Sequence, residues 1–291
     1  YTAVVSLSRE SGTFNDIQAA LDFVRRQGGG RILVRPGTYI IAKALTIYGD
    51  TLIEGLSTAD CIIDFNNNTN GFTVGDGAQD VYIRNLTIQN STNANGAIYL
   101  NSVSATSKRV FITNIIFVNN TIDVGTNQSG DIRVENCITD SSDTFISTAN
   151  ASGLSWVEKN TILSPVSWTF LNCRQFNIVD NYIQSAGTNV FRGDFDFSVI
   201  SDNVVALSGS VAALDLQNTT SVRVDNNYFV TYVRLGTVSN SHITNNIFNS
   251  SIGSVHCVQM DGCSDNTITG NKIDSGTQVN IDGVRMGTNC D

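Results

Sequence analysis

Apolar and polar residues alternate in short phrases through most of this chain, and many of the phrases have an asparagine at their centre. Nine of these asparagines recur at an average interval of about 23 residues, which is a period typical of repeat architectures. The alternation before and after each asparagine predicts a strand, a bend and a second strand. The nine residues are Asn85, Asn114, Asn136, Asn160, Asn181, Asn203, Asn227, Asn246 and Asn271.

One such unit cannot close a core by itself, but stacked units can. The pattern therefore predicts an all-β fold, a single-stranded parallel β-helix or solenoid of about ten coils. We expect the asparagines to lie in one architectural column at the bends, because asparagine tolerates a left-handed backbone and stacked amides can hydrogen-bond to one another. Since a solenoid grows by adding coils, residues 1–291 are predicted to form a single domain.

The N-terminal segment follows a different pattern. Between residues 14 and 27 the apolar residues are spaced as i, i+3, i+4 and i+7, which predicts an amphipathic helix. Asn15 and Gln18 are placed like a capping box, and Gly28 to Gly30 would end the helix. The helix would cover the open end of the core, so residues 1–41 are interpreted as a cap with the first strands and residues 42–291 as coils.

Three runs in this segment resemble a known family. They read Phe-Asn-Asp-Ile-Gln-Ala-Ala-Leu at 14–21, Gly-Gly-Gly-Arg-Ile-Leu-Val at 28–34 and Pro-Gly-Thr-Tyr at 36–39. Together with the coil period, they resemble the pectate-lyase-like superfamily of right-handed parallel β-helices, which includes pectate lyases, polygalacturonases, exo-acting glucanases and phage tailspike depolymerases. The resemblance implies the fold and leaves the activity open, because that superfamily contains hydrolases, lyases, epimerases and non-catalytic stalks.

Specific catalytic signatures of the superfamily are missing. The chain has none of the polygalacturonase motifs Asn-Thr-Asp, Asp-Asp, Gly-His-Gly and Arg-Ile-Lys, and it lacks the alginate-epimerase motif Asp-Pro-His. What remains is a resemblance to tailspike-type proteins, whose catalytic carboxylates differ between members. It implies an extracellular, cell-surface or virion-associated protein and leaves a homotrimer open.

Composition argues against several classes of binding partner. The net charge of −9 argues against broad nucleic-acid binding, and because no apolar run reaches about 18 residues we expect no membrane insertion. The six cysteines contain no CxxC pair, and we expect neither a metal site nor a cofactor. Cys263 and Cys290 lie about one coil apart and could form a disulfide. Buried, reduced thiols are the alternative for the cysteines.

Charged residues make up only 15% of the chain, yet several of them collect on one predicted sheet. Each coil has a strand before its asparagine phrase, and these strands can be aligned by inward apolar pairs such as Leu214/Leu216 and Val258/Met260. The residues between and after the members of such pairs point outward. They are Tyr99 and Asn101, Arg192 and Asp194, Asp215 and Gln217, Arg234 and Gly236, Gln259 and Asp261, and Arg285. Opposite charges on neighbouring rungs could equally be cross-strand pairing without further function.

Strand spacing favours one carboxylate pair. Asp194 and Asp215 are expected to lie diagonally, roughly 8 Å apart, inside the range of roughly 6.5–9.5 Å found in inverting glycosidases. Asp261 is expected about 12 Å from Asp215, where it would bind substrate or act as a more distant acid. The predicted catalytic residues are these three aspartates. The predicted substrate-binding residues are arginines for carboxylate or sulfate groups, two glutamines, and a tyrosine that would stack on a sugar: Arg192, Arg234, Arg285, Gln217, Gln259 and Tyr99.

Two functions of different class follow. The first is a carbohydrate-active enzyme, a polysaccharide depolymerase of the glycoside hydrolase type that acts on an acidic surface glycan. The second is a non-catalytic glycan-binding, adhesive or structural stalk, and a polysaccharide lyase or epimerase is a further alternative. Close, unpaired carboxylates in a groove would favour the enzyme, whereas aspartates engaged by neighbouring arginines would favour the scaffold.

Overall fold

The computed structural model describes residues 2–8, 10, 12–69, 71–75, 78–101, 108–126, 130–140, 142–149, 154–163, 167–185, 191–207, 212–249, 256–274, 282–287 and 290. The chain divides into two compact units, residues 1–147 and 148–291. Each is built as a parallel β-solenoid, and the all-β fold class predicted from the sequence is confirmed. The expected coil number and N-terminal cap differ from the structure only in detail. Within the described part of the chain, no helix has the length and apolar character needed to cross a membrane.

The first unit begins with a short strand and the helix and continues as strands. Its elements are β1 (Thr2–Val5), α1 (Ile17–Arg26), β2 (Gly30–Val34), β3 (Gly37–Ile40), β4 (Leu45–Ile47), β5 (Thr51–Gly55), β6 (Cys61–Asn68), β7 (Phe72–Val74), β8 (Asp80–Ser91), β9 (Ile98–Leu100), β10 (Lys108–Val118), β11 (Ile122–Thr126), β12 (Gly130–Glu135), β13 (Ile138–Asp140) and β14 (Thr144–Ala149), whose last residues belong to the second unit.

The described elements of the second unit are strands. They are β15 (Ser155–Glu158), β16 (Thr161–Ile162), β17 (Ser167–Arg174), β18 (Phe176–Val179), β19 (Tyr182–Ser185), β20 (Phe191–Asp196), β21 (Val199–Ser201), β22 (Val204–Leu207), β23 (Ala212–Gln217), β24 (Arg223–Asp225), β25 (Tyr228–Phe229), β26 (Tyr232–Gly236), β27 (His242–Thr244), β28 (Ile247–Asn249), β29 (His256–Asp261), β30 (Thr267–Thr269), β31 (Lys272–Asp274) and β32 (Asp282–Met286).

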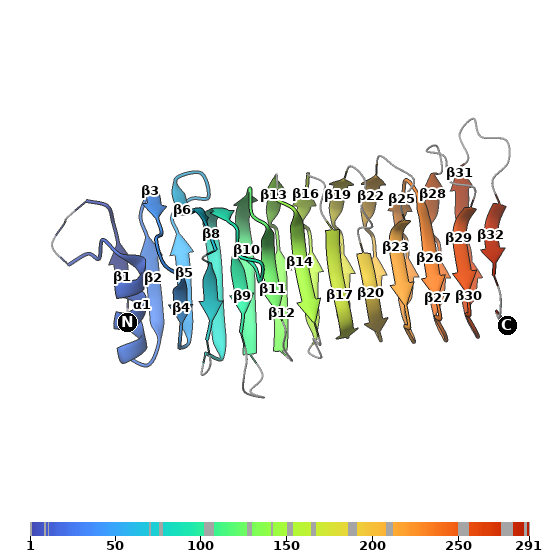
Figure 1. Ribbon diagram of the computed structural model, residues 1–291, viewed down its shortest axis with the longest axis horizontal. Coiled ribbons are helices and arrows are strands. Elements are labelled where there is room, and N and C mark those ends of the chain that lie inside the picture. Colours follow the sequence, from blue (N-terminus) through green and yellow to red (C-terminus); the bar gives the residue numbers. More distant parts are fainter. Residues whose placement is uncertain are drawn as a thin grey trace. The chain divides into compact units, whose positions relative to one another are not determined.

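Each coil of the second unit contributes strands that pair in parallel with the corresponding strands of the next coil. Thus β20 pairs with β23, β21 with β24 and β22 with β25. The strands β20 and β23, and likewise β22 and β25, lie side by side in Figure 1. Inward residues of successive rungs meet in the core, as Val224 and Ile243 do in one column. Phe229 and Phe248 stack with ring centroids 5.6 Å apart. Because side chains alternate between the two faces of each strand, stacking the coils brings the apolar residues together in the core of the unit and leaves the polar residues on its outside.

The helix α1 forms where the apolar spacing predicts it, but it is shorter than residues 14–27. Asp16 is its N-cap, and the Asp16 carboxylate accepts hydrogen bonds from the main-chain N–H groups of Gln18 and Ala19. The expected capping box of Asn15 and Gln18 is therefore wrong by one residue, because the carboxylate at position 16 satisfies the free N–H groups of the first turn. The predicted apolar face is confirmed as buried: Ile17, Ala20, Leu21 and Val24.

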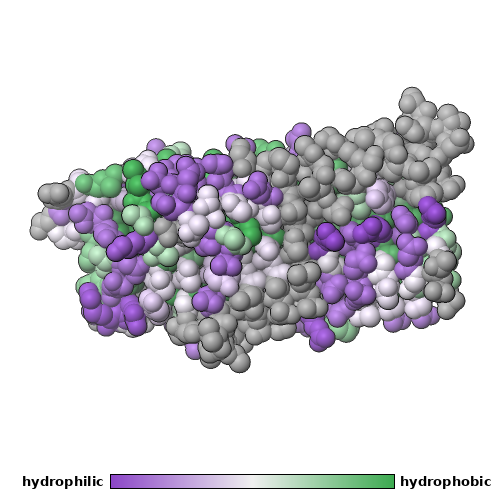
Figure 2. All heavy atoms as spheres, in the orientation of Figure 1, coloured by the Kyte–Doolittle hydropathy of each residue, from purple (hydrophilic) through white to green (hydrophobic). Residues whose placement is uncertain are grey.

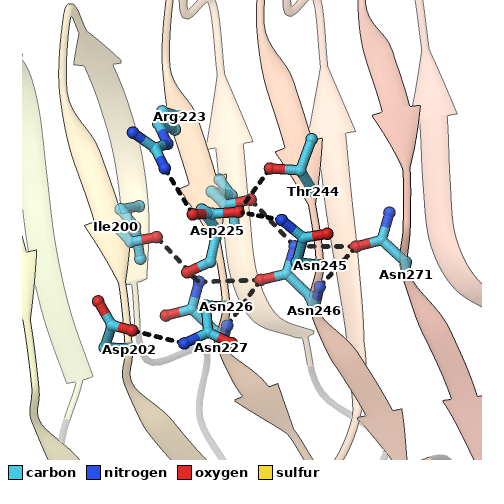
Figure 3. A network of polar contacts seen from close by, with 11 residues as sticks. Ile200, Asp202, Arg223, Asp225, Asn226, Asn227, Thr244, Asn245, Asn246 and Asn271 are labelled. Carbon is cyan, nitrogen blue, oxygen red and sulfur yellow. Dashed lines mark hydrogen bonds and ion pairs between the residues drawn. The ribbon is translucent and has the colours of Figure 1, made fainter.

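Six of the nine asparagines form a continuous ladder inside the second unit. Asn203, for example, donates from Nδ2 to Oδ1 of Asn227 (2.9 Å), and its main-chain N–H donates to the same oxygen (2.9 Å). The Asn203 Nδ2 also donates to the main-chain carbonyl of Ile178 (2.8 Å). Figure 3 shows the next steps of the ladder, from Asn227 to Asn246 and from Asn246 to Asn271. The ladder comprises Asn160, Asn181, Asn203, Asn227, Asn246 and Asn271.

The other three asparagines do not belong to such a ladder, so the expectation of one column for all nine is wrong. Asn85, Asn114 and Asn136 have φ of 58°, 53° and 53°, and the residue after each of them is buried. In the second unit the left-handed position falls one residue earlier than the ladder asparagine, for example at Asp202 before Asn203 (φ 59°). A shift of one residue at the bend exchanges the inward and outward side chains.

This difference makes a stability test possible. We expect Asn203→Ala to lower the free energy of unfolding by about 1–3 kcal/mol, because the buried N–H of Asn181 and the carbonyl of Ile178 would both lose a partner. Asn114→Gly is the control: glycine tolerates the left-handed backbone at this position (φ 53°), and the exposed side chain that is lost contacts the Asn85 amide (2.8 Å), so the effect should be much smaller. Chemical denaturation of the two variants measures the difference, and equal effects would contradict a buried, structural ladder.

Candidate functional site

Five strands of one sheet in the second unit carry the charged residues that the sequence singled out. The strands β20, β23, β26, β29 and β32 are parallel and adjacent, and their alignment by inward apolar pairs is confirmed. One outward column, which we call the arginine column, is in register from rung to rung: Arg192, Asp215, Arg234, Gln259 and Arg285. Hydrophilic side chains gather over these strands on the face shown in Figure 2.

Asp215 and Arg234 form a doubly hydrogen-bonded pair within the column. The Arg234 Nε donates to Asp215 Oδ1 (2.9 Å) while its Nη2 donates to Oδ2. Gln217 donates from Nε2 to the same Oδ1 (2.6 Å). Asp215 is 0% exposed, whereas the Arg234 side chain remains 41% exposed. The buried Asp215 carboxylate therefore fixes the orientation of the Arg234 guanidinium, while part of the Arg234 side chain stays exposed to solvent.

A second outward column runs beside the first, two residues further along each strand. Gln217, Gly236 and Asp261 are in register, and Asp194 precedes them at the rung where Gly193 pairs with Leu216. The Gln217 side chain lies over Gly236: a Cβ at position 236 would lie 2.4 Å from Oε1 of Gln217, so a larger residue there would require this side chain to move. Asp194 therefore lies two residues along β20 from Arg192, the residue that pairs with Asp215.

Asp194 is half-buried, and its environment favours the protonated acid. Burial raises the pKa of this carboxyl group above its usual range, and the negative charge of Asp196 raises it further. Asp196, on the same strand, accepts hydrogen bonds from the main-chain N–H and the hydroxyl of Thr220 (both 2.9 Å) and lies 3.7 Å from Nε of Arg174. Sequence reasoning missed Asp196 and Arg174. The alternation of Arg192, Asp194 and Asp196 along β20 was the signal that could have found them.

The other predicted site residues are more exposed. Arg192 and Arg285 are exposed at the two ends of the arginine column, and Asp261 is exposed and accepts a hydrogen bond from Nε2 of Gln259 (3.2 Å). Tyr99 lies on β9 in the first unit, in register with Thr73 and Gly125 of the neighbouring strands. Tryptophan rings can also stack on sugars, but the side chain of Trp168 on β17 lies outside the described residues.

Chemically, the described site offers guanidinium, carboxylate and amide groups. The described residues contain no group of three histidine, cysteine or acidic side chains arranged to hold a metal ion. The arginine forks are suited to carboxylate, sulfate or phosphate groups of a ligand. Asp194 is suited to donate a proton, since a half-buried carboxyl group with a raised pKa keeps its proton to higher pH than an ordinary one.

Comparison with known proteins supports the fold. No family model matches the chain, and no curated protein matches it. Among solved structures, it is similar to PfbA, a surface adhesin of Streptococcus pneumoniae, with a TM-score of 0.60 and 14% identity over 88% of this chain and 85% of that chain. It is also similar to the catalytic domain of a GH87 alpha-1,3-glucanase in complex with tetrasaccharides, with a TM-score of 0.51 and 15% identity over 99% of this chain and 68% of that chain.

A third similar structure is the Dettilon tailspike protein, with a TM-score of 0.51 and 13% identity over 93% of this chain and 64% of that chain. At these identities the likeness concerns the fold alone. The fold is the parallel β-helix, in agreement with the resemblance to the pectate-lyase-like superfamily noted in the sequence.

Proposed function

We propose that this protein binds an acidic polysaccharide on the sheet of its second unit that carries the arginine column. The observation that supports the proposal best is the anchoring of Arg234 by the buried carboxylate of Asp215. A guanidinium that is already oriented loses less conformational freedom on binding a carboxylate or sulfate group than a free side chain does. Asp215 is in this view a positioning residue for Arg234.

The spacing of the arginines fits a polymer better than a small anion. Arg192, Arg234 and Arg285 alternate with uncharged or acidic residues, so consecutive arginines are two rungs apart. Two rungs of a parallel sheet correspond to about 10 Å. An extended chain with regularly spaced anionic groups could contact several of these cations at once, and such multivalent contact raises the apparent affinity without any single strong site.

The fold neighbours are compatible with this function. The solved structures similar to this chain include a surface adhesin, a tailspike protein and a glucanase in complex with tetrasaccharides. We therefore place the proposed glycan and the protein outside the cell, at a cell surface or on a virion.

Binding can be tested with two polymers that share one backbone. We expect the protein to bind dextran sulfate and not dextran, and Arg192→Ala to raise the Kd for dextran sulfate about tenfold, the scale of one lost hydrogen bond to a charged group. Added salt should weaken binding further. Calorimetry or surface plasmon resonance measures both effects.

The control is Arg109→Ala, which changes the net charge equally but removes an exposed arginine of the first unit that is paired with Asp80 (2.6 Å). Equal weakening by the two substitutions would show that only overall charge matters and would contradict a site at the arginine column. Equal binding of dextran and dextran sulfate would contradict recognition of anionic groups.

Hydrolysis of the bound glycan is the second candidate function, and the raised pKa of Asp194 is the observation that favours it. Asp194 would act as general acid, with Asp215 or the exposed Asp261 as base. Because Asp215 is 0% exposed and bonded to Arg234, it has to exchange partners before it can activate water. New reducing ends without unsaturated products on an acidic polysaccharide would support the hydrolase, whereas new reducing ends together with unsaturated products would indicate a lyase.

A further inference from the structure

Two cysteines meet at the C-terminal end of the second unit. The Cys290 Sγ lies 3.5 Å from the main-chain nitrogen of Cys263, and both thiols are reduced in the structure. Cys263 is buried and its Sγ lies 3.5 Å from the main-chain oxygen of Leu235, whereas Cys290 is half-buried. Burial raises the pKa of the Cys263 thiol, and the neighbouring Cys290 raises it further. The two side chains are therefore close enough to influence each other although 27 positions separate them.

Of the three described strands between the two cysteines, β32 is weakly held. β32 is the last strand of its sheet and pairs with β29 alone among the described strands. Its inward residues, which would be covered in the middle of a solenoid, remain exposed: Val284 is 44% and Met286 57% exposed. After β32 the chain is tied to the preceding coil by the hydrogen bond from Gly287 N–H to the Met260 carbonyl (2.6 Å). An edge strand with few buried contacts opens more easily than a strand in the middle of a sheet.

We propose that Cys263 and Cys290 are the site of a disulfide that forms under oxidising conditions and fastens β32 to the preceding coil. The oxidant we assign is a low-molecular-weight disulfide such as glutathione disulfide. The Cys290 thiolate attacks one sulfur of glutathione disulfide, forms a mixed disulfide and releases one glutathione thiolate.

Cys263 completes the exchange. Its thiol loses a proton, its sulfur attacks the Cys290 sulfur, and the second glutathione leaves as a thiolate. Two protein thiols are thereby oxidised to one disulfide, and one glutathione disulfide is reduced to two glutathione molecules. Cys290 reacts first because it is the more accessible of the two, while the raised pKa of Cys263 disfavours its thiolate before the mixed disulfide forms.

Peptide mapping tests the bond directly. The full chain is incubated in glutathione disulfide, the remaining thiols are blocked, and a complete tryptic digest is analysed by mass spectrometry. We expect one linked pair of peptides, residues 235–272 with residues 286–291, and fragmentation of the pair should assign the bond to Cys263 and Cys290, because the first peptide also contains Cys257. A Cys290 that carries glutathione without becoming linked to Cys263, or a link from Cys290 to another cysteine, would overturn the proposal.

Limited proteolysis of the folded protein tests what the bond does. Lys272 and Arg285 lie between the two cysteines, and we expect oxidation to slow tryptic cleavage at Arg285 at least about tenfold, because cleavage requires local opening of β32. Cys290→Ser, treated identically, should show no slowing and is the matched control, since the half-buried side chain can be replaced without emptying the core. Equal slowing in wild type and Cys290→Ser would overturn the role of the bond.

Discussion

Asp123→Asn should remove a large pH dependence from the stability of the first unit. Asp123 is 0% exposed on β11, and its Oδ1 accepts hydrogen bonds from Nδ2 of Asn120 (3.0 Å) and from the Ser142 hydroxyl (2.8 Å). Its Oδ2 lies in short contact with the Thr139 hydroxyl. Burial raises the pKa of Asp123 from an ordinary value of 3.8 to about 7, although all three partners favour the ionised form.

The direction in which stability changes with pH follows from proton linkage. Because the folded state holds the Asp123 proton more tightly than the unfolded chain, the protonated carboxyl group contributes stability that is fully present below about pH 4 and is lost as the pH rises through about 7. The difference between pKa values of 3.8 and about 7 corresponds to about 4 kcal/mol. The neighbouring Cys137 does not titrate in this range, since burial raises its pKa to about 12.

Asparagine at position 123 keeps the shape without the charge, because Oδ1 can still accept from Asn120 and Ser142 while Nδ2 donates to Thr139. The free energy of unfolding of wild type should therefore fall relative to Asp123→Asn by up to about 4 kcal/mol between about pH 4 and pH 8. Urea unfolding across this range measures it. Asp143→Asn, at an exposed position nearby, is the control. Parallel curves for wild type and Asp123→Asn would contradict a buried carboxyl group with a raised pKa.

The second large expected effect is on the catalytic rate. On an acidic polysaccharide that the wild type cleaves, Asp194→Asn and Asp215→Asn should each lower kcat by at least about 10²-fold, the scale of general acid–base catalysis. Loss of the Asp194 acid should also remove the alkaline limb of the kcat profile, because the raised pKa of Asp194 sets the pH at which the proton donor is lost.

The two variants should differ in stability. Asp194 is half-buried, and we expect Asp194→Asn to unfold at nearly the wild-type temperature. Asp215→Asn should lower the melting temperature, because Asp215 is fully buried and Arg234 would lose its charged partner. The sequence-based expectation that both side chains project freely from the surface is therefore wrong for Asp215. Wild-type kcat in both variants would exclude the pair from catalysis, and Arg192→Ala, expected mainly to raise KM, is the comparison for a binding residue.

The sequence predicted the rung register of the second unit well, for a simple reason. Inward apolar pairs such as Leu214/Leu216 alternate with outward polar residues, and a strand has only two faces, so the pairs align neighbouring coils without further information. Arg234, for example, pairs with Asp215 as this alignment predicts.

The sequence did not reveal the bends equally well. Asn114 and Asn203 both occur in short apolar phrases. Asn114 itself has the left-handed backbone and is exposed, whereas Asn203 follows the left-handed residue and is buried in the ladder. The period is the same for both, because a shift of one residue hardly changes an interval of about 23. The hydrogen bonds of the adjacent coils distinguish the two, and a single phrase does not contain them.

By itself, then, the amino-acid sequence determined the parallel solenoid, the helix over its N-terminal end and the outward column of charged residues, because these depend on local periods of two, 3.6 and about 23 residues. Tertiary structure alone decided that Asp215 is buried beneath Arg234 and that Asp123 is enclosed by Asn120, Thr139 and Ser142. Burial and hydrogen bonding of a carboxylate depend on side chains from neighbouring coils. The contacts that these side chains make across the strands cannot be predicted from the sequence of a single repeat.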